Sequence, residues 1–393
     1  MNILVLTTKL ITSENSGYTR RLYPFLKELK KNNHKITLIT FYENNNELNN
    51  LKQSCEYWDK VITVRMSRMC GYLRMLKGII SGLPFKLEFV KTFKMSKTIE
   101  RELQQNNYDI IYSHFYRMAY YMKKYKKYKC YVDLCDSHYL LYQRQLEQET
   151  NLLKQFFIKI EKERILKYEK SCINEFNKIS FISETDKNVY TNIEQKHNIA
   201  VIPNGVDTEY FYNKNKAFYN SNEIIYLGSM FSVANHDAVM YFLNKIYPLI
   251  KQKNPSVVFK IVGANPRQEL LEFVKKDSSV IVTGAVDDVR EHIENACISV
   301  APVRIAAGVQ NKILETLSMG IPTVTTPEGI EGIENKDNTI IVADSDESFA
   351  SKVLEILGNK EFRERYSQKG RDFCVKNYSW KVATKKMENF MEE

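Results

Sequence analysis

Short apolar runs rich in β-branched residues alternate along the chain with longer segments of mixed hydrophobic and polar character. Most of the runs are continuously apolar, which is typical of strands buried on both faces of a parallel sheet. They lie at 3–8, 35–41, 60–64, 109–113, 131–134 and 179–182 in the first half, and at 223–227, 257–262, 280–283, 298–301, 323–326 and 339–342 in the second. The segments between them, such as 20–31, 237–253 and 311–319, are long enough for crossover helices. The pattern therefore predicts the α/β class, with two doubly wound domains.

A boundary between the two series is expected at 196–205. There a polar stretch meets IPNGVD, in which Pro203 and Gly205 interrupt regular structure. The last stretch, 360–393, has the pattern of two charged helices.

The net charge of +10 is unevenly placed. Residues 1–200 hold 34 Lys and Arg against 21 Asp and Glu, whereas the remainder holds 23 against 26. This asymmetry predicts that the first domain faces an anionic partner. The seven cysteines are odd in number and form no CxxC pair, which argues against a disulfide framework and a zinc knuckle and favours a reducing cytosol. The start of the chain is expected to be a buried strand and not a signal peptide, and no apolar run is long enough to span a bilayer.

The segment 301–320, APVRIAAGVQNKILETLSMG, holds the most informative group of polar residues. Parallel sheets bind ligands beyond the carboxyl ends of their strands, and this segment follows such a strand. Arg304, Lys312 and the N–H groups near Gly308 are suited to a diphosphate, and the Glu315 carboxylate is suited to a ribose diol. A solvated helix with a surface Lys–Glu pair is the plainer interpretation. No GxGxxG motif is present, so a nicotinamide or flavin cofactor is disfavoured.

These motifs resemble the family 4 glycosyltransferases of the GT-B fold. In the second half the matching pieces are FIS (181–183), VIPNGVD (201–207), YLGSM (226–230), KIVG (260–263), VTGAVDDV (282–289) and VAPVRIAAGVQNKILETLSMGIPTVTT (300–326). The first half matches through SGYTRR, YDIIYSH and VDLCDS, and VDLCDS with YEKSC resembles a bacterial branch that builds surface polysaccharides. The resemblance implies two Rossmann-like domains with a cleft between them. Residues 1–197 would bind the acceptor, residues 198–377 would bind the nucleotide-sugar donor, and 378–393 would pack back onto the first domain.

The resemblance also implies roles for individual residues. Glu315 matches the second glutamate of the family's E-x7-E motif and would bind the ribose, while Lys312 and Arg304 would neutralise the diphosphate. The remaining donor-binding residues implied are Gly17, Gly228, Ser229, Asn235, Gly263, Val286, Gly308, Val309, Gln310 and Asn311. Two positions depart from the family pattern: Ala307 replaces the first motif glutamate, and Ser229 stands where a basic residue is common.

The expected reaction is a retaining transfer from a UDP- or GDP-sugar to a glycan or a polyprenyl-diphosphate-linked acceptor, without a metal or other cofactor. The leaving diphosphate would gain charge, which Arg304, Lys312 and backbone dipoles would stabilise. In the first domain, Asp136 and His138 after the strand at 131–134, and His114 after the strand at 109–113, are the candidates to act near the anomeric carbon.

A basic and apolar segment at 65–97 predicts contact with a membrane. Its basic residues include Arg68, Arg74, Lys77, Lys86, Lys91 and Lys94, with apolar residues interleaved at helical spacing. This places the protein in the cytoplasm, peripherally on the inner face of the cell membrane. The alternative is a set of core-facing apolar residues beneath a solvated basic face. Nucleic-acid binding is disfavoured because no matching motif accompanies the charge.

Two other functions remain compatible with the sequence. One is a GT-B nucleotide-sugar epimerase. The other is a catalytically silent GT-B module that binds a sugar nucleotide or acts as a scaffold, which Ala307 keeps open. The sequence does not specify the sugar, the base, the acceptor or the oligomeric state.

Overall fold

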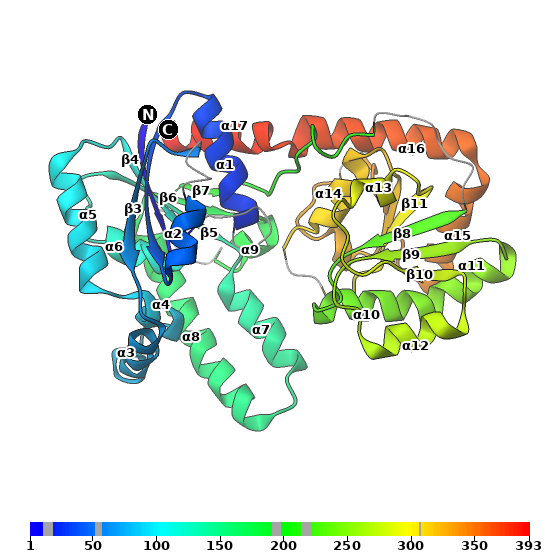
Figure 1. Ribbon diagram of the computed structural model, residues 1–393, viewed down its shortest axis with the longest axis horizontal. Helices are drawn as coiled ribbons and strands as arrows, with labels where there is room; N and C mark the ends of the chain where they lie inside the picture. The colour runs from blue at the N-terminus through cyan, green and yellow to red at the C-terminus, as the bar shows by residue number, and fades with distance from the viewer. Residues whose placement is uncertain (11–18, 52–56, 191–197, 214–221, 306–307, 336) are drawn as a thin grey trace. The chain divides into compact units, whose positions relative to one another are not determined.

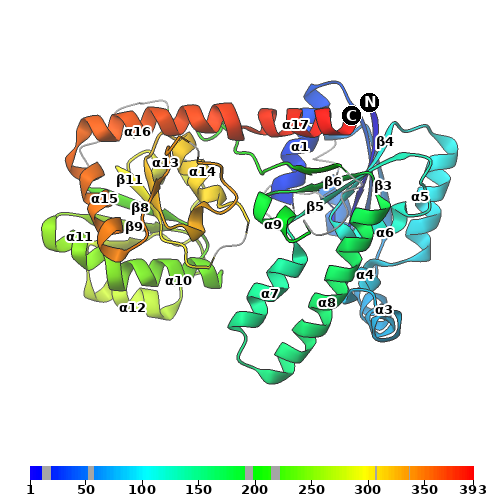
Figure 2. The same ribbon diagram turned by 180° about the vertical axis from the view of Figure 1, so that it is seen from behind.

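The computed structural model describes residues 1–393 except 11–18, 52–56, 191–197, 214–221, 306–307 and 336. The chain divides into two compact units, one made of Met1–Pro203 with Thr384–Glu393 and the other of Asn204–Ala383. Each unit holds one parallel sheet covered by helices (Figures 1 and 2). The predicted fold class, with two doubly wound parallel sheets, is therefore confirmed.

The first unit contains a seven-stranded sheet with the order β3-β2-β1-β4-β5-β6-β7. All neighbouring strands are parallel. The strands are β1 (Asn2–Thr7), β2 (Lys35–Tyr42), β3 (Lys60–Arg65), β4 (Ile110–His114), β5 (Lys129–Cys135), β6 (Lys178–Phe181) and β7 (Asn198–Val201). The apolar runs predicted all of these strands except β7, which extends the sheet by pairing with β6.

Helices connect these strands, and most of them bury apolar residues against the sheet or against each other. They are α1 (Thr19–Lys31), α2 (Asn45–Leu51), α3 (Arg68–Ser81), α4 (Phe85–Val90), α5 (Phe93–Gln105), α6 (Tyr116–Met122), α7 (His138–Gln148), α8 (Leu152–Glu175) and α9 (Glu184–Asn188). The central strands β1, β4 and β5 are almost wholly buried, as expected for a sheet covered on both faces. Figure 1 shows α7 and α8 as a hairpin that projects beyond the sheet.

The second unit contains a six-stranded parallel sheet with the order β10-β9-β8-β11-β12-β13. Its strands are β8 (Glu223–Leu227), β9 (Val258–Val262), β10 (Val280–Val282), β11 (Ile298–Ala301), β12 (Thr323–Thr325) and β13 (Ile341–Val342). Its helices are α10 (Val233–Tyr241), the π-helix η2 (Phe242–Ile246), α11 (Tyr247–Lys253), α12 (Gln268–Lys276), α13 (Arg290–Ile293), α14 (Asn311–Ser318), the 3-10 helix η3 (Glu328–Ile330), α15 (Asp346–Gly358), α16 (Lys360–Phe373) and the π-helix η4 (Cys374–Tyr378). In both sheets the first strand along the chain lies third from one edge, which is the Rossmann order.

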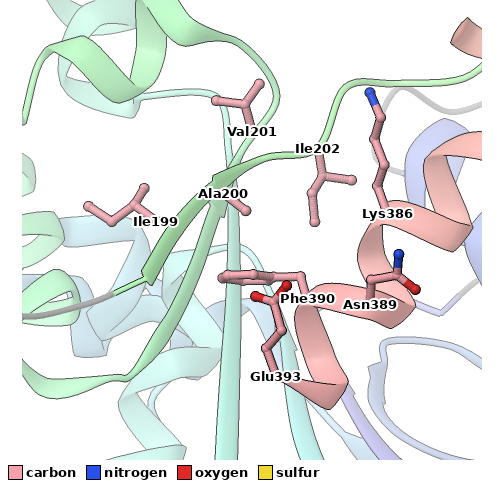
Figure 3. A pocket seen from close by; sticks show the side chains of 8 residues that line it. All are labelled: Ile199, Ala200, Val201, Ile202, Lys386, Asn389, Phe390 and Glu393. Carbon is pink, nitrogen blue, oxygen red and sulfur yellow. The ribbon is translucent and has the colours of Figure 1, made fainter.

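The last helix, α17 (Trp380–Glu392), returns the chain to the first unit. Its Glu388 carboxylate accepts hydrogen bonds from Asn32 (2.7 Å) and lies 2.8 Å from His34 Nε2. Figure 3 shows a pocket where α17 meets β7 and the residue after it, with Phe390 between Ala200 and Glu393. The helix therefore lies against the edge strand of the sheet, a position that protects an edge from pairing with another chain.

Gly205 lies where the chain enters the second unit. Val206 forms a parallel bridge with Ser379, and a Cβ atom at Gly205 would lie 2.9 Å from Trp380 Cα. Only glycine fits this close approach, which explains the IPNGVD motif at the boundary. The chain divides between Pro203 and Asn204, a position inside the region 196–205 and six residues beyond the domain limit of 197 that the resemblance implies, and residues 378–383 belong to the second unit.

Candidate active site

Two glycines bring the ends of β8 and β9 close together in the second unit. A Cβ atom at Gly263 would lie 1.9 Å from the Gly228 carbonyl oxygen, so no larger residue fits there. Gly228 has a φ of 153°, and its N–H donates to the Val262 carbonyl at 3.0 Å. The two loops predicted to bind the donor therefore form one backbone surface at the carboxyl edge of the sheet.

Lys312 lies next to this surface in a partly buried polar cluster. Its Nζ atom donates to Asn235 Oδ1 at 2.6 Å and to the Tyr226 hydroxyl at 2.8 Å. Asn235 in turn donates to the Ser229 carbonyl at 3.0 Å, which joins the cluster to the Gly228 loop. Burial lowers the pKa of Lys312 to about 7, although the nearby Glu315 carboxylate opposes the shift. The structure thus brings four predicted donor residues, Gly228, Ser229, Asn235 and Glu315, together around Lys312, whose pKa is lowered to near neutrality.

The N-terminus of α14 lies in the same segment as Lys312. Gly308 has a φ of 62°, a conformation that favours glycine, and Gln310 precedes the helix without a side-chain capping hydrogen bond. The Asn311 Oδ1 atom is buried and has no hydrogen-bond partner among the described residues. First-turn N–H groups without a side-chain cap attract anions, and a helix dipole adds to the effect. Glu315 lies one turn into the helix and is partly buried.

Arg304 has a partner within its own unit. Its guanidinium forms a two-point ion pair with Asp237, with Nε 3.0 Å from Oδ2, and lies 4.6 Å from the centre of the Tyr241 ring. The side chain is 52% exposed. Because this charge is already paired, the role of Arg304 at a diphosphate stays a prediction.

The other predicted donor residues have different surroundings. Val286 packs against a small cluster of buried residues beneath β8, and Val309 is buried in the core beside α14. The Ser229 hydroxyl donates weakly to the Ala264 carbonyl, at 3.4 Å. Gly17 and Ala307 lie outside the described residues.

The first unit holds a buried ion pair that sequence reasoning missed. Arg21 Nε donates to Asp133 Oδ2 at 2.8 Å, and Tyr112 and Ser180 donate to the same carboxylate at 2.9 and 2.7 Å. Burial alone would raise the pKa of Asp133, but the Arg21 guanidinium holds it well below its usual range. A signal was present in the sequence, because Asp133 is an acid in the interior of an apolar strand, with apolar residues on both sides.

His114 is part of this same buried cluster. Its Nδ1 atom lies 3.4 Å from the Tyr112 hydroxyl and 3.8 Å from Cys135 Sγ, and the side chain has no exposed surface. This position suits a structural role better than direct contact with a substrate.

Within the described ranges, one set of potential metal ligands comes together, and it consists of His114, Asp133 and Cys135. These residues do not fit a metal ion well. Arg21 already bonds to both oxygens of Asp133, and burial raises the pKa of the Cys135 thiol well above its ordinary value. A thiol must lose its proton to bind a metal. The cluster is better described as an ion pair that ties α1 to β5.

Asp136 and His138 lie together at the end of β5. His138 begins α7, and its Nδ1 atom lies 3.2 Å from the Asp136 carbonyl and 3.6 Å from a carboxylate oxygen of Glu169. Burial, followed by the neighbouring Asp186 carboxylate, raises the pKa of Asp136 to about 6. Glu169, another residue missed in the sequence, also accepts from the His138 N–H at 3.1 Å and so fixes the start of α7. The two candidates are therefore held in place at the edge of the sheet where ligands bind.

Helix α3 presents its large apolar residues to solvent. Gly71 and Gly78 are its buried residues, and Cβ atoms there would lie 2.5 Å from Phe89 and 2.8 Å from Phe85. The exposed residues are Met69, Tyr72, Leu73, Leu76, Ile79 and Ile80, at 61 to 93% of full exposure. The alternative in which these residues face the core is therefore wrong.

The basic residues predicted to contact a membrane have mixed surroundings. Lys77, Lys86 and Lys94 are exposed. Arg68 pairs with Glu43, and Arg74 donates to the Phe89 carbonyl at 2.9 Å. Lys91 lies 3.2 Å from Glu88. No helix in the described part of the chain is both long enough and apolar enough to cross a membrane.

Comparisons with known proteins cover most of the chain. The description "Glycosyltransferase Family 4" matches residues 15–210, and "Glycosyl transferases group 1" matches residues 221–359. A Klebsiella pneumoniae protein described as an uncharacterized 44.6 kDa protein in the cps region is 22% identical, with 96% of this chain and 97% of that protein covered.

Solved structures are similar over the full length. TarM of S. aureus gives a TM-score of 0.71 at 12% identity, covering 100% of this chain and 99% of its own. A glycosyltransferase from Rickettsia africae gives 0.68 at 16%, covering 100% and 98%. HepE of Anabaena in complex with UDP and glucose gives 0.64 at 10%, covering 100% and 99%. These likenesses show the GT-B fold, and with the two family matches they establish that the chain belongs to glycosyltransferase family 4.

Proposed function

We propose that the protein transfers a sugar, with retention of configuration, from a UDP- or GDP-sugar to a glycan or polyprenyl-diphosphate-linked acceptor during surface-polysaccharide synthesis. The observation that carries the proposal is Lys312, held at the N-terminus of α14 by two neutral oxygen atoms. Two relatives support the donor class, since HepE and TarM are described in complex with UDP. The Klebsiella relative in a cps region supports the process.

In this proposal the second unit binds the donor. The diphosphate lies at the start of α14, where Lys312 and the first N–H groups of the helix stabilise the charge that develops as the glycosidic bond breaks. Glu315 accepts hydrogen bonds from the ribose hydroxyls. The loops at Gly228 and Gly263 allow the base to approach the backbone closely.

The first unit binds the acceptor and supplies Asp136 and His138. The carboxylate of Asp136, with its raised pKa, would act near the anomeric carbon, and His138, whose Nδ1 atom lies 3.2 Å from the Asp136 carbonyl oxygen, would hold the Asp136 backbone in place. The leaving phosphate takes the acceptor proton on the same face of the sugar, so a two-carboxylate pair is not required.

Equilibrium binding of UDP and GDP tests the donor site. Glu315→Ala removes charge-assisted hydrogen bonds worth about 1.5–3 kcal/mol each and is expected to weaken binding roughly 100-fold. Lys312→Ala is expected to have an effect of the same order. Glu355→Ala and Lys352→Ala, which break an exposed ion pair on α15, are the matched controls. Binding unchanged by Glu315→Ala would overturn the assignment, whereas binding without any sugar transfer would favour a silent module.

We propose further that the protein attaches peripherally to the inner face of the cell membrane through α3. Its six exposed apolar residues would enter the interface, and Arg68 and Lys77 would meet anionic headgroups. Sedimentation with phosphatidylglycerol vesicles tests this, with Leu73→Ser/Ile80→Ser as the variant expected to lose binding.

A further inference from the structure

The tip of the α7–α8 hairpin exposes a second group of apolar side chains. Leu152, Leu153, Phe156 and Phe157 form the first two turns of α8, and they are 59 to 79% exposed. They lie in two i,i+4 pairs, the spacing at which helical residues make a continuous surface. Their exposure is unusual, because large apolar side chains at the start of a helix ordinarily pack against the rest of the protein.

The hairpin is held in place without these residues. Burial in α8 begins at Ile158 and continues through Ile165 and Tyr168. The Glu161 carboxylate accepts from the Phe85 N–H at 2.9 Å, which joins α8 to α4. The apolar tip therefore contributes little to folding and is free to contact a partner.

We infer that this tip, Leu152–Phe157, is a second lipid-contacting element that enters the same membrane leaflet as α3. The inference rests on the membrane attachment proposed above and extends it to a second part of the first unit. Both views show α3 and the hairpin tip projecting toward the same end of the first unit (Figures 1 and 2). Two apolar surfaces directed toward one side fit a single planar partner.

Two exposed lysines, Lys154 and Lys159, flank the apolar tip. The nearest acids on the hairpin are the exposed Glu147 and the partly buried Glu149, which lies 3.9 Å from Lys154. Lysines beside an inserted apolar surface place their ammonium groups at the headgroups while their stems stay in the apolar layer.

Contact of the hairpin tip with lipid would also position the His138 and Asp136 pair. Helix α7 runs from His138 to the tip loop, and its 11 residues span about 16 Å at 1.5 Å per residue. A tip held in the lipid would therefore fix the height of the His138 and Asp136 pair above the membrane.

Vesicle sedimentation of the full chain tests the inference, with phosphatidylcholine alone and phosphatidylcholine mixed with phosphatidylglycerol. Phe156→Ser/Phe157→Ser is expected to lower the partition coefficient about 100-fold, roughly tenfold for each ring withdrawn from the lipid. Leu271→Ser/Val375→Ser, which removes exposed apolar side chains from the second unit, is the control and is expected to bind as the wild type does. Thermal unfolding of each variant verifies that the fold is intact.

A tryptophan at the tip gives a second measurement. Phe157→Trp is expected to shift its emission to the blue on phosphatidylglycerol vesicles and to be quenched by brominated lipid, relative to a wild-type baseline from Trp58 and Trp380. Binding equal to wild type in the double serine variant, or no quenching at position 157, would overturn the hairpin's role while leaving α3 attachment in place. Failure of the wild type to bind any vesicle would overturn both proposals. Loss of a lipid-free dimer in the double serine variant would instead assign the tip to a second copy.

Discussion

Raising the pH above neutrality should weaken nucleoside diphosphate binding, because Lys312 then loses its proton. Burial lowers the pKa of Lys312 to about 7 in the free protein. A bound diphosphate favours the ammonium form, so the pKa of Lys312 in the complex must be higher. The sign follows from this difference: binding is strongest below pH 7, where the ammonium is already present, and weakens as the pH rises through the free-state value.

The size of the effect follows from the two pKa values. If the diphosphate restores an ordinary lysine pKa of about 10.4, the dissociation constant rises roughly 50-fold between about pH 7 and pH 9. Over this range binding also takes up a proton, about 0.9 per nucleotide near pH 8. The second ionisation of a phosphate has a pKa near 6 and so lies below this window.

Isothermal titration calorimetry measures both quantities. Titrations of UDP and of GDP in two buffers with different ionisation enthalpies give the proton uptake directly. Lys312→Met keeps the length of the side chain without the charge, and it should bind weakly with no proton uptake and no dependence on pH in this range. A wild-type affinity that is equal at both ends of the range, or a methionine variant with the wild-type pH dependence, would show that the Lys312 ammonium does not bind the diphosphate.

Three further predictions follow from the same structure. Lys312→Met should raise the free energy of unfolding near pH 7 by about 2 kcal/mol. Holding Lys312 at its lowered pKa costs the folded state about 4 kcal/mol, and its hydrogen bonds return about 2 kcal/mol, so the methionine removes a net cost. An unchanged or lower unfolding midpoint in urea would contradict this. Asp133→Ala should destabilise the protein by about 3–5 kcal/mol because it leaves the Arg21 guanidinium buried and unpaired, whereas Asp59→Ala at an exposed ion pair should cost less than about 1 kcal/mol. Turnover should fall as the pH drops through about 6, where Asp136 gains a proton. Asp136→Asn should turn over slowly at every pH, and its rate should not fall further as the pH drops through about 6. A wild-type rate that stays constant through this range would argue against a role for the carboxylate.

Most of the fold follows from local pattern. The continuous apolar runs predict every strand of the second sheet and all but one of the first, because strands buried on both faces need apolar residues at each position. The exception is β7, Asn198–Val201, which follows a polar stretch and is held by pairing with β6 and by contact with α17. Such a strand depends on tertiary contacts that a local window does not contain.

The two halves of the candidate site differ in how far sequence predicts them. Lys312 and Glu315 lie one turn apart on the same helix, the first one after β11, so their common location follows from local spacing. The Arg21–Asp133 pair joins residues 112 positions apart, and only the register of α1 against β5 brings them together. An acid inside an apolar strand indicates that a partner is needed but does not identify it.

Helix α3 shows where pattern alone is ambiguous. Its apolar residues at helical spacing are compatible with a core-facing helix and with an interfacial one. The choice is made by Gly71 and Gly78, which pack closely on the rings of Phe89 and Phe85 and so turn the larger side chains outward. Glycines at i,i+7 on a helix rich in leucine and isoleucine are a signal for this arrangement.

The most direct test of the central claim is acceptor-dependent release of nucleoside diphosphate from a panel of UDP- and GDP-sugars, with a membrane extract as the source of acceptor. We expect at least one donor to release its diphosphate faster when the extract is present, and Glu315→Ala to abolish this release while its thermal midpoint stays at the wild-type value. No release from any donor in the panel, or release that Glu315→Ala leaves unchanged, would contradict it.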